Sequence, residues 1–377
     1  MVHQVKKIAI LGSTGSIGQQ TLDIVRKFPD TLKVVGLACG NNKVIFKDQL
    51  REFNPNFAFS AGRFPLSTSV KSMSMEEIAS QPDVDIVVVA TTGKAGLGPT
   101  ISALKAGKTV AIANKEILVM AGELITGMVA QYGSTILPID SEHCAIWQCL
   151  QGESHSISRL LLTASGGPFF GMTKAQLADV TVDEALNHPT WKMGKKVTID
   201  SATLFNKGLE VIEARWLFNI PYDKIEIIIH RQSIIHSMIE FVDGSIKAQL
   251  STPDMHLPIQ YALLYPERTA NDDIKPLSFN AMQSLTLEPA RYDDFPCLKL
   301  ALEAAKKGGT YPAVLCAADE VAVDLFINRK TKFLQIAEII ERTMALHKPV
   351  YKPSLAEIIE SDKWAGETAR EIAGKIT

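Results

Sequence analysis

Two short stretches, far apart in the chain, supply three carboxylates of the kind that bind a metal ion. Asp140 and Glu142 follow an apolar, strand-like run, and Glu210 lies on a predicted helix after Asn206 and Lys207. Residues two apart in an extended segment point to the same side, so we expect Asp140 and Glu142 to face one way. Residues three and four apart on a helix also share a side, which groups Asn206, Lys207 and Glu210. Because the carboxylates offer only oxygen donors, the sequence predicts Mg²⁺ or Mn²⁺ rather than zinc.

A glycine-rich loop near the N-terminus predicts a dinucleotide site. Gly12, Gly15 and Gly18 follow a predicted strand and open a predicted helix, where free N–H groups can donate hydrogen bonds to a pyrophosphate. The spacing is GxxGxxG rather than GxGxxG, and a glycine turn without a ligand is the alternative. No Asp or Glu follows the second predicted strand, where residues 40–42 stand, so the sequence favours NADP over NAD.

Alternating patterns predict the fold class. The first third of the chain alternates short aliphatic runs with helical patterns, which is typical of an α/β fold with a doubly wound, Rossmann-like parallel sheet. We expect residues 1–133 to form this NADP domain, residues 134–264 an α+β catalytic and dimerisation domain, residues 265–290 a linker, and residues 291–377 a helical domain. Ligands gather at the carboxyl ends of such strands, where the glycine loop, residues 114–116 and residues 140–142 are all predicted.

A second set of polar residues could bind a phosphate. Ser165, Ser201, Asn206 and Lys207 offer hydroxyls, an amide and a cation. Each alone has a simpler interpretation as a turn serine, a helix cap or a surface residue. Ser201 is the predicted N-cap of a helix that runs to about residue 218.

A loop bounded by Pro and Gly, residues 188–194, is interpreted as a mobile lid. His188 and Trp191 lie in it, and an exposed indole without a partner is unusual. His236 stands among apolar residues, so its own context favours a core histidine. Lys115 follows Asn114 at a strand end, where a solvated lysine is the alternative.

Composition narrows the classes of partner. A chain of 377 residues is expected to form two or three domains. An apolar fraction of 46%, a charged fraction of 21% and a net charge of −2 give no sign of a nucleic-acid or anionic-membrane partner. Since no run of eighteen apolar residues occurs, no membrane span is predicted.

The cysteines and the N-terminus indicate a compartment. Five cysteines without a CxxC spacing fit a reducing environment, so we expect a cytoplasmic protein. The location that we predict is the bacterial cytoplasm. The N-terminus enters a strand at once, which predicts no signal peptide; a transit peptide cut from a longer precursor is the alternative.

Taken together, these motifs closely resemble one family, 1-deoxy-D-xylulose-5-phosphate reductoisomerase. The resemblance runs from residue 8 to about residue 329 and rests on the motifs at residues 12–18, 106–109, 113–116, 138–143, 164–169, 188–194, 200–210, 212–218 and 295–301. It implies isomerisation of 1-deoxy-D-xylulose 5-phosphate, then NADPH-dependent reduction to 2-C-methyl-D-erythritol 4-phosphate, a step of isoprenoid precursor synthesis. It also implies a homodimer.

The resemblance further implies roles for individual residues. The metal ligands would be Asp140, Glu142 and Glu210. The catalytic and substrate-binding residues would be Lys115, Ser141, Glu142, Ser165, His188, Trp191, Ser201, Asn206, Lys207, Glu210 and His236. The cofactor contacts would be Thr14, Gly15, Ser16, Ile17, Gly40, Asn41, Asn42, Asn114, Glu116 and Gly194. The chain departs from the family at Asn41, where a lysine is usual, and the family places His236 near the site rather than in the core.

Two other classes of function remain alternatives from the residues alone. A metal-independent NADP-dependent aldehyde dehydrogenase or reductase would use the same nucleotide domain and turn over in the presence of a chelator. A non-catalytic NADP-binding protein would bind cofactor without turnover. The three carboxylates and the phosphate-binding set argue against both.

Overall fold

The protein forms two compact units in a computed structural model that describes residues 5–62, 70–153, 156–281 and 284–376. Unit 1 comprises Met1–Ile117, Ile125–Cys144 and Asp254–Pro276, and unit 2 comprises Leu118–Leu124, Ala145–Pro253 and Leu277–Thr377. Residues 1–4, where the sequence predicts no signal peptide, lie outside the described residues. The predicted four-part division at residues 133, 264 and 290 stays a prediction.

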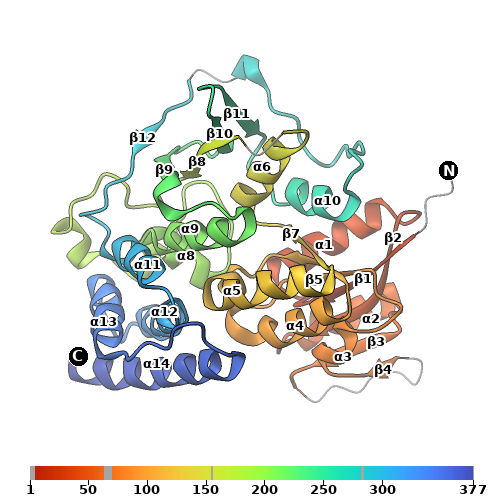
Figure 1. Cartoon of the computed structure of the whole chain (residues 1–377), viewed down its shortest axis with the longest axis horizontal. Helices are drawn as coiled ribbons and strands as arrows, with labels where there is room; N and C mark the ends of the chain where they lie inside the picture. The colour runs from red at the N-terminus through yellow and green to blue at the C-terminus, as the bar shows by residue number, and fades with distance from the viewer. Residues whose placement is uncertain (1–4, 63–69, 154–155, 282–283, 377) are drawn as a thin grey trace. The chain divides into compact units, whose positions relative to one another are not determined.

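Unit 1 contains a parallel sheet of seven strands in the order β4-β3-β2-β1-β5-β6-β7 (Figure 1). This order reverses direction at β1, as in doubly wound α/β folds, so the predicted Rossmann-like fold class is confirmed. The strands are β1 (Lys6–Leu11), β2 (Leu32–Cys39), β3 (Phe57–Ser60), β4 (Lys71–Ser72), β5 (Ile86–Val89), β6 (Thr109–Ile112) and β7 (Thr135–Pro138). The helices are α1 (Ser16–Lys27), α2 (Lys43–Phe53), α3 (Met75–Ala79), α4 (Leu97–Lys105), α10 (His256–Leu264) and much of α5 (Lys115–Tyr132), while α6 (Ser141–Leu150) begins here.

The central strands of this sheet are aliphatic because helices cover them. All four residues of β5 and the last four of β1 are buried, as expected for parallel strands packed on both faces. The continuous apolar runs of β1 and β5 therefore mark them as central strands of the sheet.

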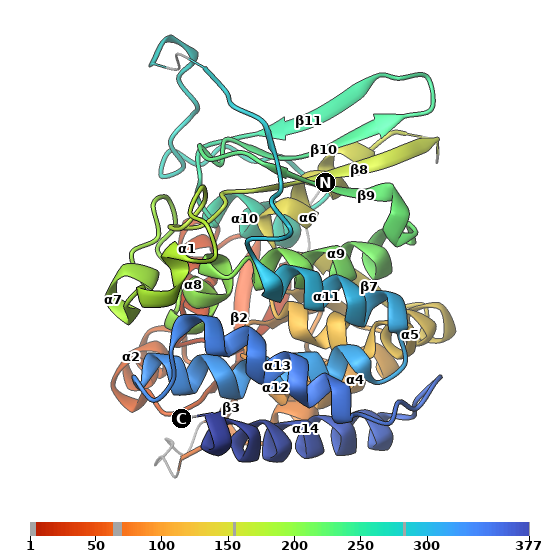
Figure 2. The same ribbon diagram turned by 90° about the vertical axis from the view of Figure 1, so that its left-hand side faces the viewer.

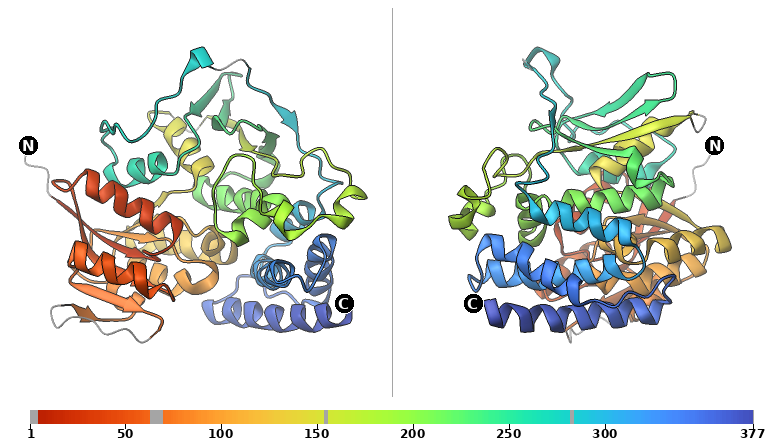
Figure 3. Two further views of the ribbon diagram at one scale, coloured as in Figure 1. Left: turned by 180° about the vertical axis from the view of Figure 1, so that it is seen from behind. Right: turned by 60° about the vertical axis from the view of Figure 1, so that its left-hand side comes forward.

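Unit 2 contains a mixed sheet of five strands in the order β11-β10-β8-β9-β12. The strands are β8 (Ile157–Ala164), β9 (Ile225–Ile229), β10 (Ile235–Phe241), β11 (Ile246–Leu250) and β12 (Glu288–Pro289). β8 and β9 are parallel, and the other pairs are antiparallel. β10 and β11 form a hairpin, and Gly244 in its turn has a φ of +83°. Figure 3 shows the long yellow-green excursion that leaves β8 and carries α7 (Val182–Ala185) before it reaches α8 (Lys195–Ala202).

The C-terminal part of unit 2 is helical, as the sequence predicts. Its helices are α11 (Pro296–Lys307), α12 (Tyr311–Ile327), α13 (Phe333–Leu346) and α14 (Leu355–Ile376). The last three pack against one another, and α11 packs against α9 (Phe205–Phe218), as Figure 2 shows. Within the described ranges, no helix has the length and apolarity that a bilayer crossing requires.

Candidate active site

The glycine loop connects β1 to α1, as the sequence predicts. Gly12 has a φ of +93°, and a Cβ atom there would lie 2.3 Å from the carbonyl oxygen of Ala90. A Cβ on Gly18 would lie equally close, 2.3 Å, to the Gly12 oxygen. Both positions therefore require glycine. Helix α1 begins at Ser16 with Gly15 as its N-cap and no side-chain cap bond. Its first N–H groups can therefore donate hydrogen bonds to an anion such as a pyrophosphate.

A buried glutamine from α2 holds the start of this loop. The Ser13 hydroxyl donates to Oε1 of Gln49 at 2.7 Å, and Nε2 of Gln49 donates to the Ser13 carbonyl oxygen at 2.8 Å. Ser13 is fully buried and Gln49 nearly so. These two hydrogen bonds connect the loop to α2, which begins just after the residues that end β2.

The residues after β2 are exposed. Gly40, Asn41 and Asn42 precede α2, and the Asn42 side chain accepts a hydrogen bond from the Ile45 N–H at 3.3 Å as the N-cap of that helix. Asn41, which precedes this cap residue, also has an exposed side chain at the end of β2. Its proposed contact with a cofactor 2′-phosphate stays a prediction.

Asn114 and Lys115 lie where β6 passes into α5. Asn114 is buried and donates from Nδ2 to the carbonyl oxygen of Gly93 at 2.8 Å. Lys115 Nζ lies 2.5 Å from Oδ2 of Asp140, with both side chains only 12% exposed. Lys115 is therefore no solvated surface lysine: it faces a carboxylate from the end of β7. Glu116 follows in the first turn of the same helix.

The expectation that Asp140 and Glu142 share a face of an extended segment is wrong. β7 ends at Pro138, and α6 begins at Ser141, so Glu142 lies in the first turn of a helix. The Cys144 N–H donates to the Asp140 carbonyl oxygen at 2.8 Å as the helix starts. Acidic residues are favoured at this helix end because they interact well with the macrodipole.

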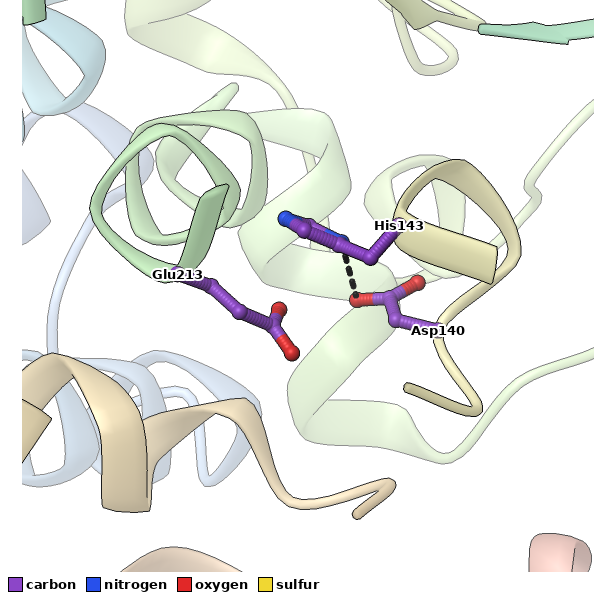
Figure 4. Close-up of side chains that lie close together, drawn as sticks. All are labelled: Asp140, His143 and Glu213. Atoms are coloured by element: carbon purple, nitrogen blue, oxygen red, sulfur yellow. Dashed lines mark ion pairs between the residues drawn. The ribbon is translucent and has the colours of Figure 1, made fainter. Parts of the chain in front are cut away.

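Oxygen donors and a histidine nevertheless gather at the start of α6. The Ser141 hydroxyl donates to Oε2 of Glu142 at 2.5 Å. Figure 4 shows the Asp140 carboxylate next to the ring of His143, where Oδ2 and Nδ1 lie 3.9 Å apart. His143 is fully buried. Carboxylates at this depth suit a cation, either a lysine or a hard metal ion.

In unit 2, His188 joins the two serines predicted for the phosphate site. Its Nε2 lies 3.1 Å from Oγ of Ser165 and 3.1 Å from Oγ of Ser201. Its Nδ1 accepts hydrogen bonds from the N–H groups of Thr190 and Trp191. Because Nδ1 accepts, the neutral ring carries its proton on Nε2 and points it toward the two hydroxyls. Burial lowers the pKa of His188 to about 4, which keeps the ring neutral at physiological pH.

The prediction that Ser201 caps the helix running to Phe218 is wrong. Ser201 lies inside α8, and α9 begins only at Phe205 after Leu204, which has a φ of +56°. A left-handed residue breaks the helical path between the two helices. The Ser201 hydroxyl is therefore not used for capping, and it faces His188 instead.

The first two turns of α9 carry the predicted polar side. Nδ2 of Asn206 donates to Oε1 of Glu210 at 2.5 Å, and Lys207 Nζ forms an ion pair with Oε2 of Glu210. Lys207 and Glu210 are both buried, so the interpretation of Lys207 as a surface residue does not hold. Asn206, which is partly exposed, and the buried Lys207 and Glu210 thus form one group of an amide, a cation and a carboxylate.

Trp191 and His236 lie side by side. Their ring centroids are 6.2 Å apart, with the planes tilted by 55°. His236 is buried on β10, which agrees with its core-like sequence context, yet it contacts the residue expected in the lid. Gly194 is exposed and is the N-cap of α8, so the loop that carries Trp191 ends there.

Comparison with known proteins identifies the family. Family models of 1-deoxy-D-xylulose 5-phosphate reductoisomerase match residues 8–122, and models of its C-terminal domains match residues 136–218 and 250–368. A relative of this name from Thermoanaerobacter pseudethanolicus is 52% identical over 98% of this chain and 99% of its own length. Another from a Geobacillus species is 48% identical over 97% of this chain and 99% of its own length. The chain belongs to the 1-deoxy-D-xylulose 5-phosphate reductoisomerase family.

Solved structures of family members agree with the fold. The Zymomonas mobilis reductoisomerase in complex with NADPH is 39% identical, has a TM-score of 0.89, and the match covers 98% of this chain and 99% of that one. A reductoisomerase in complex with NADPH, fosmidomycin and magnesium is 38% identical, has a TM-score of 0.91, and the match covers 99% of each chain. Both matches therefore extend through both units of this chain.

Reasoning from the sequence missed several residues of this reductoisomerase-family chain. Gln49 could have been noticed as a polar residue three positions after the buried Phe46 on the apolar side of α2. Lys196 and Asp200 stand four apart and form an ion pair, a spacing that the sequence displays. Asp319, which also contacts Lys196, lies more than a hundred residues away and gave no local signal.

Proposed function

We propose that this protein isomerises 1-deoxy-D-xylulose 5-phosphate and reduces the product with NADPH to 2-C-methyl-D-erythritol 4-phosphate, using a divalent metal ion. The observation that carries the proposal is the match, through both units, to a family member in complex with NADPH, fosmidomycin and magnesium. The glycine loop on the parallel sheet and the buried oxygen donors give that chemistry a physical basis in this chain.

The residues fit a hard metal ion. The proposed ligands of one Mg²⁺ or Mn²⁺ are Asp140, Glu142 and Glu210, because carboxylate oxygens suit these ions and Glu210 is nearly fully buried. When bound, the ion would polarise the substrate's carbonyl and hydroxyl oxygens. Lys115, against Asp140, would keep positive charge beside the substrate while the carbon skeleton rearranges.

The substrate phosphate would bind to the group around His188. Its Nε2–H, the hydroxyls of Ser165 and Ser201, the Asn206 amide and the Lys207 ammonium offer four neutral donors and one cation. Anchoring a phosphate away from the reacting carbons orients the substrate and supplies binding energy for loop closure. Trp191, beside His236, would cover the substrate and exclude water during hydride transfer.

NADPH would bind to unit 1. The N–H groups at the start of α1, with Thr14, Gly15, Ser16 and Ile17, would receive the pyrophosphate. Gly40, Asn41 and Asn42 would lie at the adenosine end, and Asn114, Glu116 and Gly194 would complete the site. Since no carboxylate follows β2, NADPH would still be preferred over NADH.

One assay tests the activity. NADPH oxidation is followed with 1-deoxy-D-xylulose 5-phosphate, with Mn²⁺ or with EDTA, and the product is identified by mass spectrometry. Oxidation that needs both substrate and metal supports the proposal. Turnover that survives EDTA would favour a metal-independent reductase, and cofactor binding without turnover would favour a non-catalytic NADP-binding protein.

We also propose a homodimer in the bacterial cytoplasm. Val242 and Ile246, at the β10–β11 turn of unit 2, are 73% and 52% exposed, which suits a covered apolar surface. All five cysteines are buried and free, as expected in a reducing compartment. Light scattering after size exclusion should give the mass of two chains, and Val242→Asp should shift it toward one. A monomeric wild type would contradict the dimer.

A further inference from the structure

Three charged side chains form a cluster between α8, the helix that carries Ser201, and α12. Lys196 Nζ lies 2.6 Å from Oδ2 of Asp200 and 2.8 Å from Oδ2 of Asp319. The Asp200 and Asp319 side chains are 2% and 0% exposed, and that of Lys196 is 29% exposed. The ammonium also lies 5.5 Å from the centre of the Phe205 ring. We refer to Lys196, Asp200 and Asp319 as the charged cluster.

Local helix stability does not account for this cluster. Lys196 is the second residue of α8, where a positive charge is unfavourable because the helix N-terminus is itself positive. Asp319 lies inside α12, among Ala317, Ala318 and Val321, where an apolar residue would pack without the desolvation of a charge. The two buried carboxylates and their partly exposed ammonium are therefore not explained by helix stability alone.

Two members of the cluster, Lys196 and Asp200, lie near the two ends of α8. Lys196 comes two residues after Gly194, where the predicted lid loop ends, and Asp200 immediately precedes Ser201. Ser201 contacts His188 at 3.1 Å, and His188 is the first residue of that loop. The bond from Lys196 to Asp319 connects this whole arrangement to α12. Any shift of α8 along α12 would move Ser201 and the end of the loop together.

We propose that Lys196 and Asp319 are positioning residues that hold α8 against α12, so that Ser201 and the loop end are in place for the substrate phosphate. This inference rests on the proposed function, because it assigns the C-terminal helices a part in binding that substrate. Neither residue needs to touch the substrate. Each acts through α8, so their loss should weaken substrate binding and leave the glycine loop of unit 1, where most of the cofactor contacts are proposed, unaffected.

The test compares Lys196→Met, Asp319→Asn and the double variant with wild type. Lys195→Met is the matched control, since Lys195 is exposed on the same helix turn. The measurements are KM for 1-deoxy-D-xylulose 5-phosphate, KM for NADPH, the melting temperature, and the Kd of fosmidomycin by calorimetry. Lys196→Met should raise the substrate KM and the fosmidomycin Kd by about tenfold or more, since small misplacements of binding groups cost up to about a hundredfold. The NADPH KM should stay within about twofold, as should every constant of Lys195→Met.

The double variant separates positioning from stability. Lys196→Met alone leaves two buried carboxylates without their ammonium and should lower the melting temperature. Adding Asp319→Asn removes one of those charges, so the melting temperature should recover while the substrate KM stays high. Recovery of both together would assign the cluster a purely structural role and overturn the inference.

Two further outcomes are distinguishable. If Lys196→Met does not fold, Asp319→Asn alone decides, and an unchanged substrate KM and fosmidomycin Kd in that variant would overturn the inference. If the wild type does not oxidise NADPH with this substrate, the proposed function fails instead. The fosmidomycin Kd then still tests whether the charged cluster positions α8.

Discussion

The His188 ring is held in one protonation state by the groups around it. Two backbone N–H groups donate to Nδ1, two serine hydroxyls lie against Nε2, and burial lowers the pKa to about 4. A neutral histidine can donate one hydrogen bond to a phosphate without depending on the pH of the cell. The charge for the proposed phosphate binding would then come from Lys207, which is buried as the third residue of α9, three residues after the break at Leu204.

We therefore predict that His188 does not titrate between pH 5.5 and 8 in the free enzyme. The nitrogen chemical shifts of its ring, assigned with a His188→Gln variant, should show a proton on Nε2 throughout this range. Since the folded pKa is lowered, the unfolded state takes up more protons between about pH 6.5 and 4, and the stability contributed by this residue falls as the pH drops through that window. A midpoint near 6.5 would contradict the assignment.

Glu210 is predicted to be a metal ligand whose loss spares the cofactor site. Glu210→Gln removes one negative oxygen donor, keeps the size of the side chain, and retains an acceptor for Asn206. Turnover should fall by at least about a hundredfold and the Kd for Mn²⁺ should rise, because hard cations depend on the charge of their ligands. The Kd for NADPH should be unchanged. Near-normal turnover at ordinary Mg²⁺ concentration would remove Glu210 from the ligand set.

The contact between α1 and α10 depends on a histidine that is expected to be charged. Nδ1 of His256 lies 2.6 Å from Oδ1 of Asp254, and Nε2 lies 3.4 Å from Oδ2 of Asp23. Burial alone would lower the pKa of His256, but the hydrogen bonds to Asp254 and Asp23 and their charges outweigh burial, so the pKa is raised. The side chain is 30% exposed, so solvent screens part of this effect.

A raised folded-state pKa fixes the sign of the pH dependence. The ion pairs contribute their full stability below about pH 6.5, the ordinary value, and lose it as the pH rises through the folded pKa. We predict that His256→Gln lowers the melting temperature at pH 6 more than at pH 8.5. An equal loss at both values would show that His256 acts only through packing or neutral hydrogen bonds.

The connection between α2 and the glycine loop gives a second prediction about paired elements. Gln49→Leu keeps the bulk of the side chain but leaves the buried Ser13 hydroxyl and carbonyl without their partner. An unsatisfied buried polar group costs about 1–3 kcal/mol, so the loop should shift and the Kd for NADPH should rise several-fold. Lys47→Leu, on the exposed side of α2, is the control. If both variants bind NADPH equally well, the hydrogen bonds between Gln49 and Ser13 do not position the glycine loop.

The same elements show what the sequence could predict. The glycine loop and the strands before Asn114 and Asp140 follow from local patterns, because glycine geometry and buried aliphatic runs are decided within a few residues. The ends of α8 and α9 do not: Leu204 adopts a left-handed conformation that nothing in its own residue type favours. The Asp-Ser-Glu sequence of residues 140–142 fits both an extended segment and a helix start, so the local pattern does not decide that Glu142 lies in α6. Asp319 reaches Lys196 only through tertiary packing, which leaves no mark in a local pattern.

Considered as a whole, the chain places the glycine loop and the proposed phosphate-binding residues in different units. The glycine loop and the β2 end belong to unit 1, whereas Ser165, His188, Ser201 and Lys207 belong to unit 2. We predict that NADPH alone protects amides of residues 12–18 and 113–116 from hydrogen exchange. Fosmidomycin with Mg²⁺ should add protection at residues 165–167 and 188–207, because binding stabilises the segments that it contacts. Protection of residues 165–167 and 200–207 by NADPH alone, with no further change on adding fosmidomycin, would contradict this division.

Unit 1 is not complete until late in synthesis. Its first strand is bonded to its last helix, since Lys6 Nζ donates to the carbonyl oxygens of Leu263 and Tyr265 at 3.0 and 2.9 Å. A ribosome that adds about 5–20 residues per second needs on the order of tens of seconds to translate the chain between these partners. The side of α1 that contacts α10 therefore stays uncovered while residues 145–253 of unit 2 are synthesised. Translation of the two units is thus interleaved, and a gene fragment that stops before residue 256 would leave unit 1 without its last helix, α10.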